Sequence, residues 1–446
     1  MSQVMSHLKS RASVSVLACA VSLGWAGETM ASGYAIKEQS GSLLGTAFAG
    51  AGSSAQDPSV MFFNPAGISR LDGYRISGSA TGIFPRTVFD NDGSILTPFN
   101  LPIPGGNGGD TGKDALVPAF YVTAAPNDFL HFGLGVNAPF GLSTDYHRDW
   151  VGRYHAIEST VETTNINPVV AVKPNSWLSL GAGAQIQYID AKLTRAIDFG
   201  SILASAGVPG AAPFGSDGEV KVKGDDWGIG LTAGVLVEPI RGTRIGLSYR
   251  SQVRQNLNGD ARFKAVPLPL QANPAFQDQD VTARLTTPDS IDLSVYHEIN
   301  DRWAVMGDVQ WTNWSLFKEL RVNFEKAGVP DSVTEERWDD SWFFALGTQY
   351  KLFDSLTLRT GVAYDQTPVR DKFRTARAPD EDRFWIAVGG NYAINQWISA
   401  DLGYTHIFVR DADINENVTA GPVTYQLNGE YDNTIDIVSL QINLKF

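Results

Sequence analysis

The last ten residues, IVSLQINLKF, constrain the fold more than any other stretch of the chain. Apolar side chains occupy every second position from Val438 to Phe446, and the positions between them are polar. A period of two with one wholly apolar face predicts a β-strand that is half covered. In water protein must cover that face, whereas in a bilayer lipid can cover it. A terminal aromatic residue in such a strand is typical of outer-membrane barrels.

The same alternation recurs along the chain, in segments joined by two kinds of connection. Short connections near residues 125, 173, 238, 298, 352 and 394 carry Pro, Asn, Asp or Gly, as turns do. Long connections lie near 85–114, 142–158, 199–220, 258–279, 323–337, 374–382 and 411–430. Their alternation predicts an all-β fold, an antiparallel transmembrane barrel of about 14 strands with both termini on the short-turn, periplasmic side. A soluble multi-domain β protein, the alternative, needs no such alternation.

Composition narrows the class of protein further. After residue 31 the chain has no run of 18 apolar residues, so we expect no transmembrane helix. Hydrophobic residues nevertheless make up 43% of the chain, as a lipid-facing barrel requires. The formal net charge of −13 argues against a nucleic-acid partner.

The N-terminus predicts the compartment. Residues 1–31 combine a short basic region, a short apolar core and small residues before a cleavage site after Ala31, which predicts a secretory signal peptide. A retained helical anchor and lipidation at Cys19, the single cysteine, are the alternatives. Without another cysteine, the mature chain needs neither disulfide nor thiolate chemistry. We therefore expect export to the outer membrane of a Gram-negative bacterium.

Residues 32–73, between the signal peptide and the barrel of residues 74–446, are rich in small residues and moderately apolar. We expect this segment to pack inside the barrel as a plug (hatch), with a short helix around residues 43–48. Pro65 has a fixed φ and no backbone donor, and it disfavours the helical region at Asn64. The Asn64 side chain can satisfy free backbone groups, so Asn64-Pro65-Ala66-Gly67 reads as a rigid break rather than a plain turn.

These residues resemble a known family. SGYAIKEQSGSLLGTAFAGAGSSAQDPSVMFFNPAGISRL is similar to the plug of the outer-membrane long-chain fatty-acid transport proteins (FadL-type), a family that includes aromatic-hydrocarbon transporters. The resemblance continues through GVNAPFGLSTDY, VGRYHAI, NINPVVAV, YIDAKLTR and APDEDRFW to Phe446. It implies a porin-like transporter and not an enzyme. The ligand would be captured among outer loops, pass to an inner pocket, and leave sideways through a gap in the wall.

By the same resemblance, the gap lies at an inward kink of the third strand, next to the Asn-Pro-Ala motif. That strand is FLHFGLGVNAPFGLST, in which Pro139 removes a donor and Gly141 is the kink glycine. The alternative is a strand that ends at Pro139. Tyr34, near the mature N-terminus, would place its ring in the inner pocket.

A cation in an apolar lumen is the natural partner for a ligand carboxylate. The resemblance assigns this role to Arg195, with Lys192 as a nearby substitute; alternatively, Arg195 pairs with Asp190 or Asp198. Arg383 is a further candidate, although its acidic neighbours favour a plain ion pair.

Fatty-acid members carry another basic residue before the tenth strand, where this chain reads DSVTEERWD and offers only Arg337. This departure leaves room for an uncharged ligand.

Other functions find little support. DADINEN at 411–417 starts like a calcium loop, but Glu416 and Pro422 occupy positions that need Gly and Glu, so we expect no metal. We expect no cofactor and no catalytic residues, because no Ser-His-acid constellation can be assigned. A passive porin and a surface adhesin or phage receptor stay open. Expected partners are a long-chain fatty acid or other hydrophobic ligand, outer-membrane lipid and lipopolysaccharide, and the barrel assembly machinery through Phe446, with the chain itself a monomer.

Overall fold

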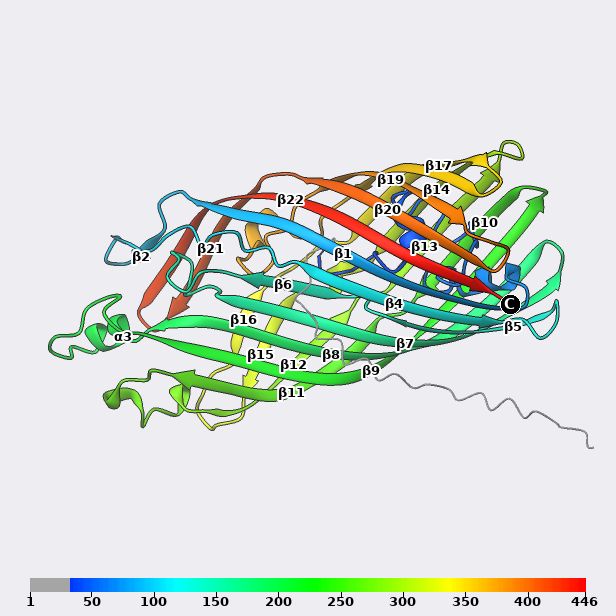
Figure 1. Cartoon of the computed structure of the whole chain (residues 1–446). Helices are drawn as coiled ribbons and strands as arrows, with labels where there is room; N and C mark the ends of the chain where they lie inside the picture. Colours follow the sequence, from blue (N-terminus) through cyan, green and yellow to red (C-terminus); the bar gives the residue numbers. More distant parts are fainter. Residues whose placement is uncertain (1–32) are drawn as a thin grey trace, which may run out of the picture.

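The computed structural model describes residues 33–446, so the predicted signal peptide, with Cys19, lies outside the described residues. Long strands form one closed antiparallel barrel of 14 strands (Figure 1). They are β1 (Tyr74–Asn91), β4 (Ala115–Ala124), β5 (Leu130–Asn137), β7 (Glu158–Asn175), β8 (Leu178–Asp198), β9 (Asp217–Ile240), β10 (Thr243–Arg250), β13 (Ser290–Glu298), β14 (Trp303–Thr312), β17 (Ser341–Phe353), β18 (Leu356–Asp365), β19 (Arg383–Ala393), β20 (Ile398–Val409) and β22 (Val423–Lys445).

The barrel closes because β22 pairs with both β20 and β1, from Arg75↔Lys445 to Asn91↔Gly429 on the β1 side. Along β19 the alternation is as predicted: Phe384 and Ile386 are exposed on the outer face, whereas Trp385 is buried. Closure leaves no strand of the barrel at a free edge, which lipid would not tolerate. The predicted barrel is therefore confirmed. Among residues 33–446, no helix is long and apolar enough to cross a membrane.

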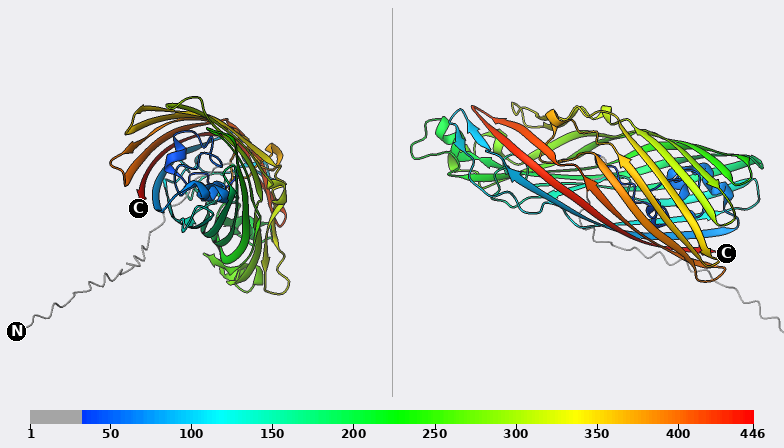
Figure 2. Two further views of the ribbon diagram at one scale, coloured as in Figure 1. Left: turned by 90° about the vertical axis from the view of Figure 1, so that its right-hand side faces the viewer. Right: turned by 90° about the horizontal axis from the view of Figure 1, so that it is seen from above.

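Several of the expected long loops are strands that continue hairpins beyond the barrel. β11 (Val253–Lys264), β12 (Gln279–Thr287), β15 (Glu319–Phe324) and β16 (Ser332–Glu335) form a sheet extension that we call the outer flap (Figures 1 and 2). The remaining outer elements include β2 (Ile95–Thr97), β3 (Leu101–Pro102), β6 (Gly141–Asp145), β21 (Ala412–Ala420), α3 (Phe199–Ser205), η2 (Leu268–Leu270), η3 (Pro274–Phe276), η4 (Trp314–Leu316) and η5 (Asp371–Phe373).

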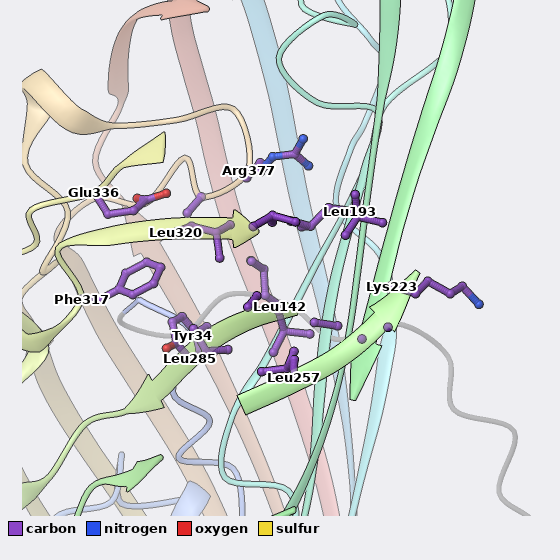
Figure 3. A pocket seen from close by; sticks show the side chains of 18 of the residues that line it. Tyr34, Leu142, Leu193, Lys223, Leu257, Leu285, Phe317, Leu320, Glu336 and Arg377 are labelled. Atoms are coloured by element: carbon purple, nitrogen blue, oxygen red, sulfur yellow. The ribbon is translucent and has the colours of Figure 1, made fainter. Parts of the chain in front are cut away.

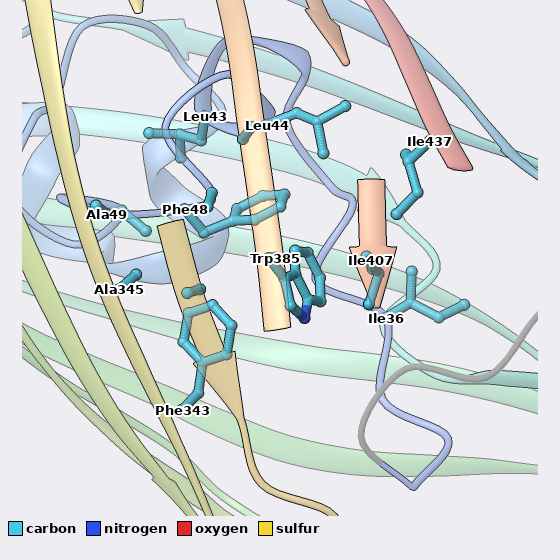
Figure 4. Close-up of a cluster of buried hydrophobic side chains, with 14 of the residues drawn as sticks. Ile36, Leu43, Leu44, Phe48, Ala49, Phe343, Ala345, Trp385, Ile407 and Ile437 are labelled. Carbon is cyan, nitrogen blue, oxygen red and sulfur yellow. The ribbon is translucent and has the colours of Figure 1, made fainter. Parts of the chain in front are cut away.

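Residues 33–73 lie inside the barrel, as Figure 2 shows, and the predicted plug is confirmed. The plug contains α1 (Gly41–Leu44), α2 (Val60–Phe63) and η1 (Pro65–Arg70). The expected helix around residues 43–48 is shorter, because Ala47 and Phe48 have positive φ values of 50° and 61°. Phe48 instead packs edge-on against Trp385 of β19, in the largest buried hydrophobic cluster (Figure 4).

The Asn-Pro-Ala motif anchors the plug to the barrel wall. Asn64 Nδ2 donates to the carbonyls of Gly52 (2.9 Å) and Val235 (3.0 Å), and Asn64 Oδ1 accepts from the Ala66 amide (3.0 Å). The approach depends on Gly234, since a Cβ there would lie 2.0 Å from Asn64 Oδ1. The resemblance implied that the motif adjoins the third strand. In the structure the motif lies against glycine residues of β8, β9 and β10 (Gly181, Gly234 and Gly246), and η1, which begins at Pro65, also contacts β5, the third strand.

Candidate functional site

An apolar cavity of about 90 Å³ lies above the plug, between the barrel wall and the outer flap (Figure 3). Most of its wall is aliphatic or aromatic. The lining residues include Tyr34, Leu142, Leu193, Leu257, Leu285, Phe317, Leu320 and Trp338. A cavity of this kind suits an acyl chain or an aromatic ring. We call it the inner cavity.

Two charged side chains from loops enter this apolar lining, Glu336 and Arg377. Glu336 is buried and its Oε2 accepts a hydrogen bond from Trp338 Nε1 at 2.9 Å. Burial raises the pKa of Glu336 to about 8, so this carboxyl is mainly protonated at neutral pH. Lys223 also borders the cavity, but its side chain extends away from the cavity (Figure 3).

A second cavity of about 900 Å³ lies further out, between the flap, β8 and β21. It is lined by both apolar and polar residues, among them Arg195. We call it the outer cavity. The two cavities share five lining residues, Leu193, Val222, Leu320, Val322 and Arg377. Arg377 therefore stands at the junction of a polar outer space and an apolar inner one.

The junction is rich in positive charge. Arg377 donates to Ser159 Oγ (2.9 Å) and to the His155 carbonyl (2.9 Å). Within residues 33–446, neither Arg195 nor Arg377 has a carboxylate within 4.0 Å, because no ion pair involves them. Burial, and then the charge of Arg195, lowers the pKa of Arg377 to about 10, so the guanidinium stays charged at neutral pH.

Glu416, the acid whose charge acts most strongly on Arg195 and Arg377, has other partners. Glu416 Oε2 lies 3.3 Å from His155 Nδ1 and accepts from the Ala376 amide at 2.9 Å. Burial alone would raise the pKa of Glu416, but His155, that amide and Arg377 hold it below its ordinary value. The segment 411–417, which starts like a calcium loop in sequence, lies mostly on β21, and within residues 33–446 no group of three His, Cys, Asp or Glu side chains could hold a metal ion.

The structure separates the predicted ligand-binding cations. Arg195 lines the outer cavity and pairs with neither Asp190 nor Asp198 within 4.0 Å; Asp198 instead caps α3 by accepting from Ser201 N at 2.8 Å. Lys192 forms an ion pair with Glu158 and lies three residues from Arg195, on the opposite face of β8. Its expected role as a substitute for Arg195 is thus corrected by strand alternation.

Arg383 forms the plain ion pair that its acidic neighbours favoured. Its guanidinium is buried and contacts Asp380, with Asp365 at 3.9 Å. It borders a separate cavity of about 20 Å³ and neither the inner nor the outer cavity. Arg383 therefore does not lie where it could bind a ligand in either cavity, contrary to its expected candidacy. Arg337 is also outside both cavities, where it is exposed and pairs with Glu335 at 3.1 Å.

Tyr34 lies at the floor of the inner cavity, in a cluster of aromatic rings. Its ring centroid is 4.6 Å from Trp314, 5.8 Å from Phe140 and 5.9 Å from Trp338. A further cavity of about 80 Å³ lies on the other side of this cluster and is lined by Phe140 and Trp314. Tyr34, Phe140, Trp314 and Trp338, which we call the aromatic partition, thus separate two cavities.

The third barrel strand is interrupted at the predicted place. β5 ends at Asn137, and the chain resumes as β6 at Gly141; β6 pairs with β7 and, on its other side, forms the isolated bridge Gly112↔Thr144. On β4, pairing with β5 begins at Phe120, so the segment before it has no ladder partner on this side. The plug bridges the interruption: Ile36 N donates to Pro139 O (2.9 Å), and Gln39 Nε2 donates to Ala138 O (2.6 Å).

Fold and cavities together define an outer-membrane transport barrel for hydrophobic compounds. A sequence profile of the family described as outer membrane protein transport protein (OMPP1/FadL/TodX) matches residues 22–446, and the chain belongs to this family. It lies in the outer membrane, and its family consists of transporters and channels rather than enzymes.

Similar proteins include carriers with named ligands. The chain is 31% identical to the long-chain fatty acid transport protein of Salmonella typhi, over 90% of this chain and 92% of that one. It is similar to a crystal structure of a Pseudomonas aeruginosa FadL homologue (25% identity, 93% and 100% covered, TM-score 0.84). The Pseudomonas putida toluene transporter TodX shares the fold (18% identity, 93% and 100% covered, TM-score 0.66).

Proposed function

We propose that this chain carries long-chain fatty acids across the outer membrane. The observation that supports this most directly is the pair of cations at the mouth of an apolar cavity. Arg195 and Arg377 have no ion-pair partner within residues 33–446, whereas the inner cavity below Arg377 is almost wholly apolar. A carboxylate bound by these guanidinium groups would leave the acyl chain in the inner cavity.

Magnitudes favour this arrangement. A charge-assisted hydrogen bond contributes about 1.5–3 kcal/mol, and each buried methylene contributes about 0.8 kcal/mol. A fatty acid can gain both contributions at this junction, the hydrogen bond through its carboxylate and the burial through its acyl chain. The aqueous periplasm and the polar sugar layer do not bury the acyl chain. In this proposal transport follows the substrate gradient.

In this proposal the ligand then passes the aromatic partition and leaves sideways at the third strand. The plug must first release that strand, to which Tyr34, Ile36 and Gln39 are hydrogen bonded. A disulfide tests this step: Ala35 and Phe140 form a β-bridge, so Ala35→Cys with Phe140→Cys would hold the plug on the interruption. Uptake that stops on oxidation and returns on reduction supports release there; unchanged uptake contradicts it.

A second candidate is uptake of aromatic hydrocarbons, favoured by the lining of the inner cavity. Except near Glu336 and Arg377, the cavity walls offer almost no polar group, and Arg337 does not supply another. The shared fold of the toluene transporter adds to this candidate.

The deciding experiment measures uptake of labelled oleate and labelled toluene by cells expressing the chain, with Arg195→Ala and Arg377→Ala beside the wild type. Oleate uptake that falls in both variants supports the fatty-acid proposal. Toluene uptake alone, unaffected by either substitution, contradicts it in favour of the hydrocarbon candidate. The monomeric state and the contact of Phe446 with assembly machinery stay predictions.

A further inference from the structure

The wall contains a second interruption, far from the third strand in sequence. β9 pairs with β10 up to Thr232↔Arg250 and with β11 from Asp225↔Asn258 onward. Residues 226–231 of β9 therefore have no ladder partner on this side. A barrel wall in lipid normally pairs every backbone group, so a stretch of this kind needs an explanation.

One backbone bond, from Ser251 N to Leu231 O at 2.9 Å, and several side chains close this interruption in place of a continuous ladder. Leu231 N donates to Ser251 Oγ (2.7 Å), and Asn256 N donates to Asp226 Oδ2 (2.6 Å). The buried Val253 side chain fills the space beside Gly228, where a Cβ would lie 2.5 Å from Val253 Cγ1. We call residues 226–231, with the facing residues 251–257, the β9–β11 break.

The break lies between an apolar space and an apolar surface. On the inner side, Leu257 and the adjacent pair Gly224↔Gly259 line the inner cavity. On the outer side, Ile229 is 74% exposed and Leu231 63% exposed, among the highest values for large apolar side chains of the barrel strands. Residues 227–231 of β9 carry no charged side chain, so the charged groups of the break are Asp226, at one end of it, and Arg254 on the facing segment.

Two buried amides flank the break without partners. Gln187, in register with Gly228, and Gln255 are fully buried, and within residues 33–446 none of their side-chain nitrogen or oxygen atoms has a hydrogen-bond partner. Unpartnered buried amides are costly. If β9 and β11 separated, these amides could bond the backbone groups that the separation frees.

The outer flap has the interruptions that such a separation requires. Arg250, Ser290 and Thr312 form one row across β10, β13 and β14, and each of these strands is interrupted just beyond that row. The interruptions fall at 251–252, 288–289 and 313–318. A flap turning about this row would move β11 away from β9 and widen the break.

We propose that the β9–β11 break is a second lateral passage, through which acyl chains and hydrocarbons move between the inner cavity and the outer leaflet. This proposal rests on the proposed function, because it needs a hydrophobic ligand in the inner cavity. It adds an opening that is independent of the plug and of the third strand.

A disulfide across the break tests the passage. Gly228→Cys with Val253→Cys joins the two sides where their side chains meet. The matched control, Lys221→Cys with Arg262→Cys, joins the same two strands at a rung that is already paired. Oxidation of the first pair should lower toluene uptake roughly tenfold, because the disulfide holds the two sides of the break together, and reduction should restore it. The control disulfide should leave uptake unchanged.

Toluene uptake that is unchanged after complete oxidation of the Gly228–Val253 pair would overturn the passage. If that barrel does not fold, Val253→Ala decides: faster toluene uptake supports the passage, and equal or slower uptake rejects it. Failure of the proposed function is distinguishable, because it would appear in the unmodified protein: absence of oleate uptake would contradict the fatty-acid proposal, while toluene uptake would still test the passage.

Discussion

The backbone amide of Gly141 donates a hydrogen bond to the carbonyl of Tyr34, with 2.8 Å between nitrogen and oxygen. This bond joins the first residue of β6 to the plug residue whose ring forms the aromatic partition. The same few plug residues thus hold the interrupted third strand and separate the inner cavity from the cavity below it. A displacement of Tyr34 would alter both the strand and the partition.

We predict that Tyr34→Ala opens the partition, whereas Tyr34→Phe does not. Loss of the ring removes contacts with Trp314 and Phe140 and should destabilise the folded barrel by about 3 kcal/mol. The Tyr34 hydroxyl is buried without a partner within residues 33–446, so Tyr34→Phe should leave the unfolding midpoint in urea equal or higher. Ion conductance in planar bilayers should rise for Tyr34→Ala only. Equal conductance of both variants would contradict the partition.

Removal of the Arg377 guanidinium should weaken binding of fatty acids but not of hydrocarbons. One charge-assisted hydrogen bond is lost, so the Kd for oleate should rise about 10- to 100-fold in Arg377→Gln. Arg337→Gln is the matched control, because Arg337 pairs with Glu335 outside both cavities. Tryptophan fluorescence titration in detergent measures both. A similar loss of toluene affinity in Arg377→Gln would indicate a structural role instead.

Oleate binding should depend on pH through Glu336. Its pKa of about 8 lies above the ordinary value because of burial, so the folded protein holds this proton at neutral pH. As pH rises through 8, the new negative charge beside Arg377 should weaken oleate binding. The same shift makes folding stability fall as pH rises from the unfolded pKa toward 8. Glu336→Gln should abolish the alkaline loss of binding, and toluene binding should not depend on pH; an unchanged pH profile in Glu336→Gln would refute the assignment.

Plug docking should be sensitive to a single methyl group on the wall. Gly234→Ala places a Cβ 2.0 Å from Asn64 Oδ1 and should displace the Asn-Pro-Ala motif. Asn64→Ala removes three hydrogen bonds and should cost about 2–4 kcal/mol. Protease protection of the plug should fall in both variants. Gly78→Ala serves as control, since the nearest atom to its Cβ would be 3.9 Å away; full protection in Gly234→Ala would exclude this docking.

The barrel could be predicted from sequence because its signal is repeated. Alternation such as that at Phe384, Trp385 and Ile386 is local, and lipid requires it in every strand. The plug was recognisable for a different reason, since Asn64-Pro65-Ala66 is a compact motif with few backbone choices. The interruption of the third strand near Pro139 could be predicted for a similar reason, because proline has no backbone N–H to donate to a neighbouring strand.

Other features depend on contacts between segments that are distant in sequence. Arg377 and Glu336 belong to loops whose sequences carry no periodic signal, and only folding brings them to one cavity. The orientation of Lys192 away from Arg195 was readable from strand alternation, once β8 is assigned as continuous. The β9–β11 break could not be inferred, because β9 changes its partner from β10 to β11 within one continuous strand, and Gly228 shows its role only once Val253 is placed beside it.

The plug rests on glycine at several places on the wall, with its own backbone facing Gly361 and Gly389 and its Asn64 facing Gly234. A surface of this kind has no side-chain knobs that must change rotamer before the plug can shift. The plug and the wall could therefore slide past each other once the hydrogen bonds that hold the plug in position are broken. Because the contact surface is smooth, the number of hydrogen bonds such as those of Asn64, rather than the packing of side chains, would limit how fast the plug moves.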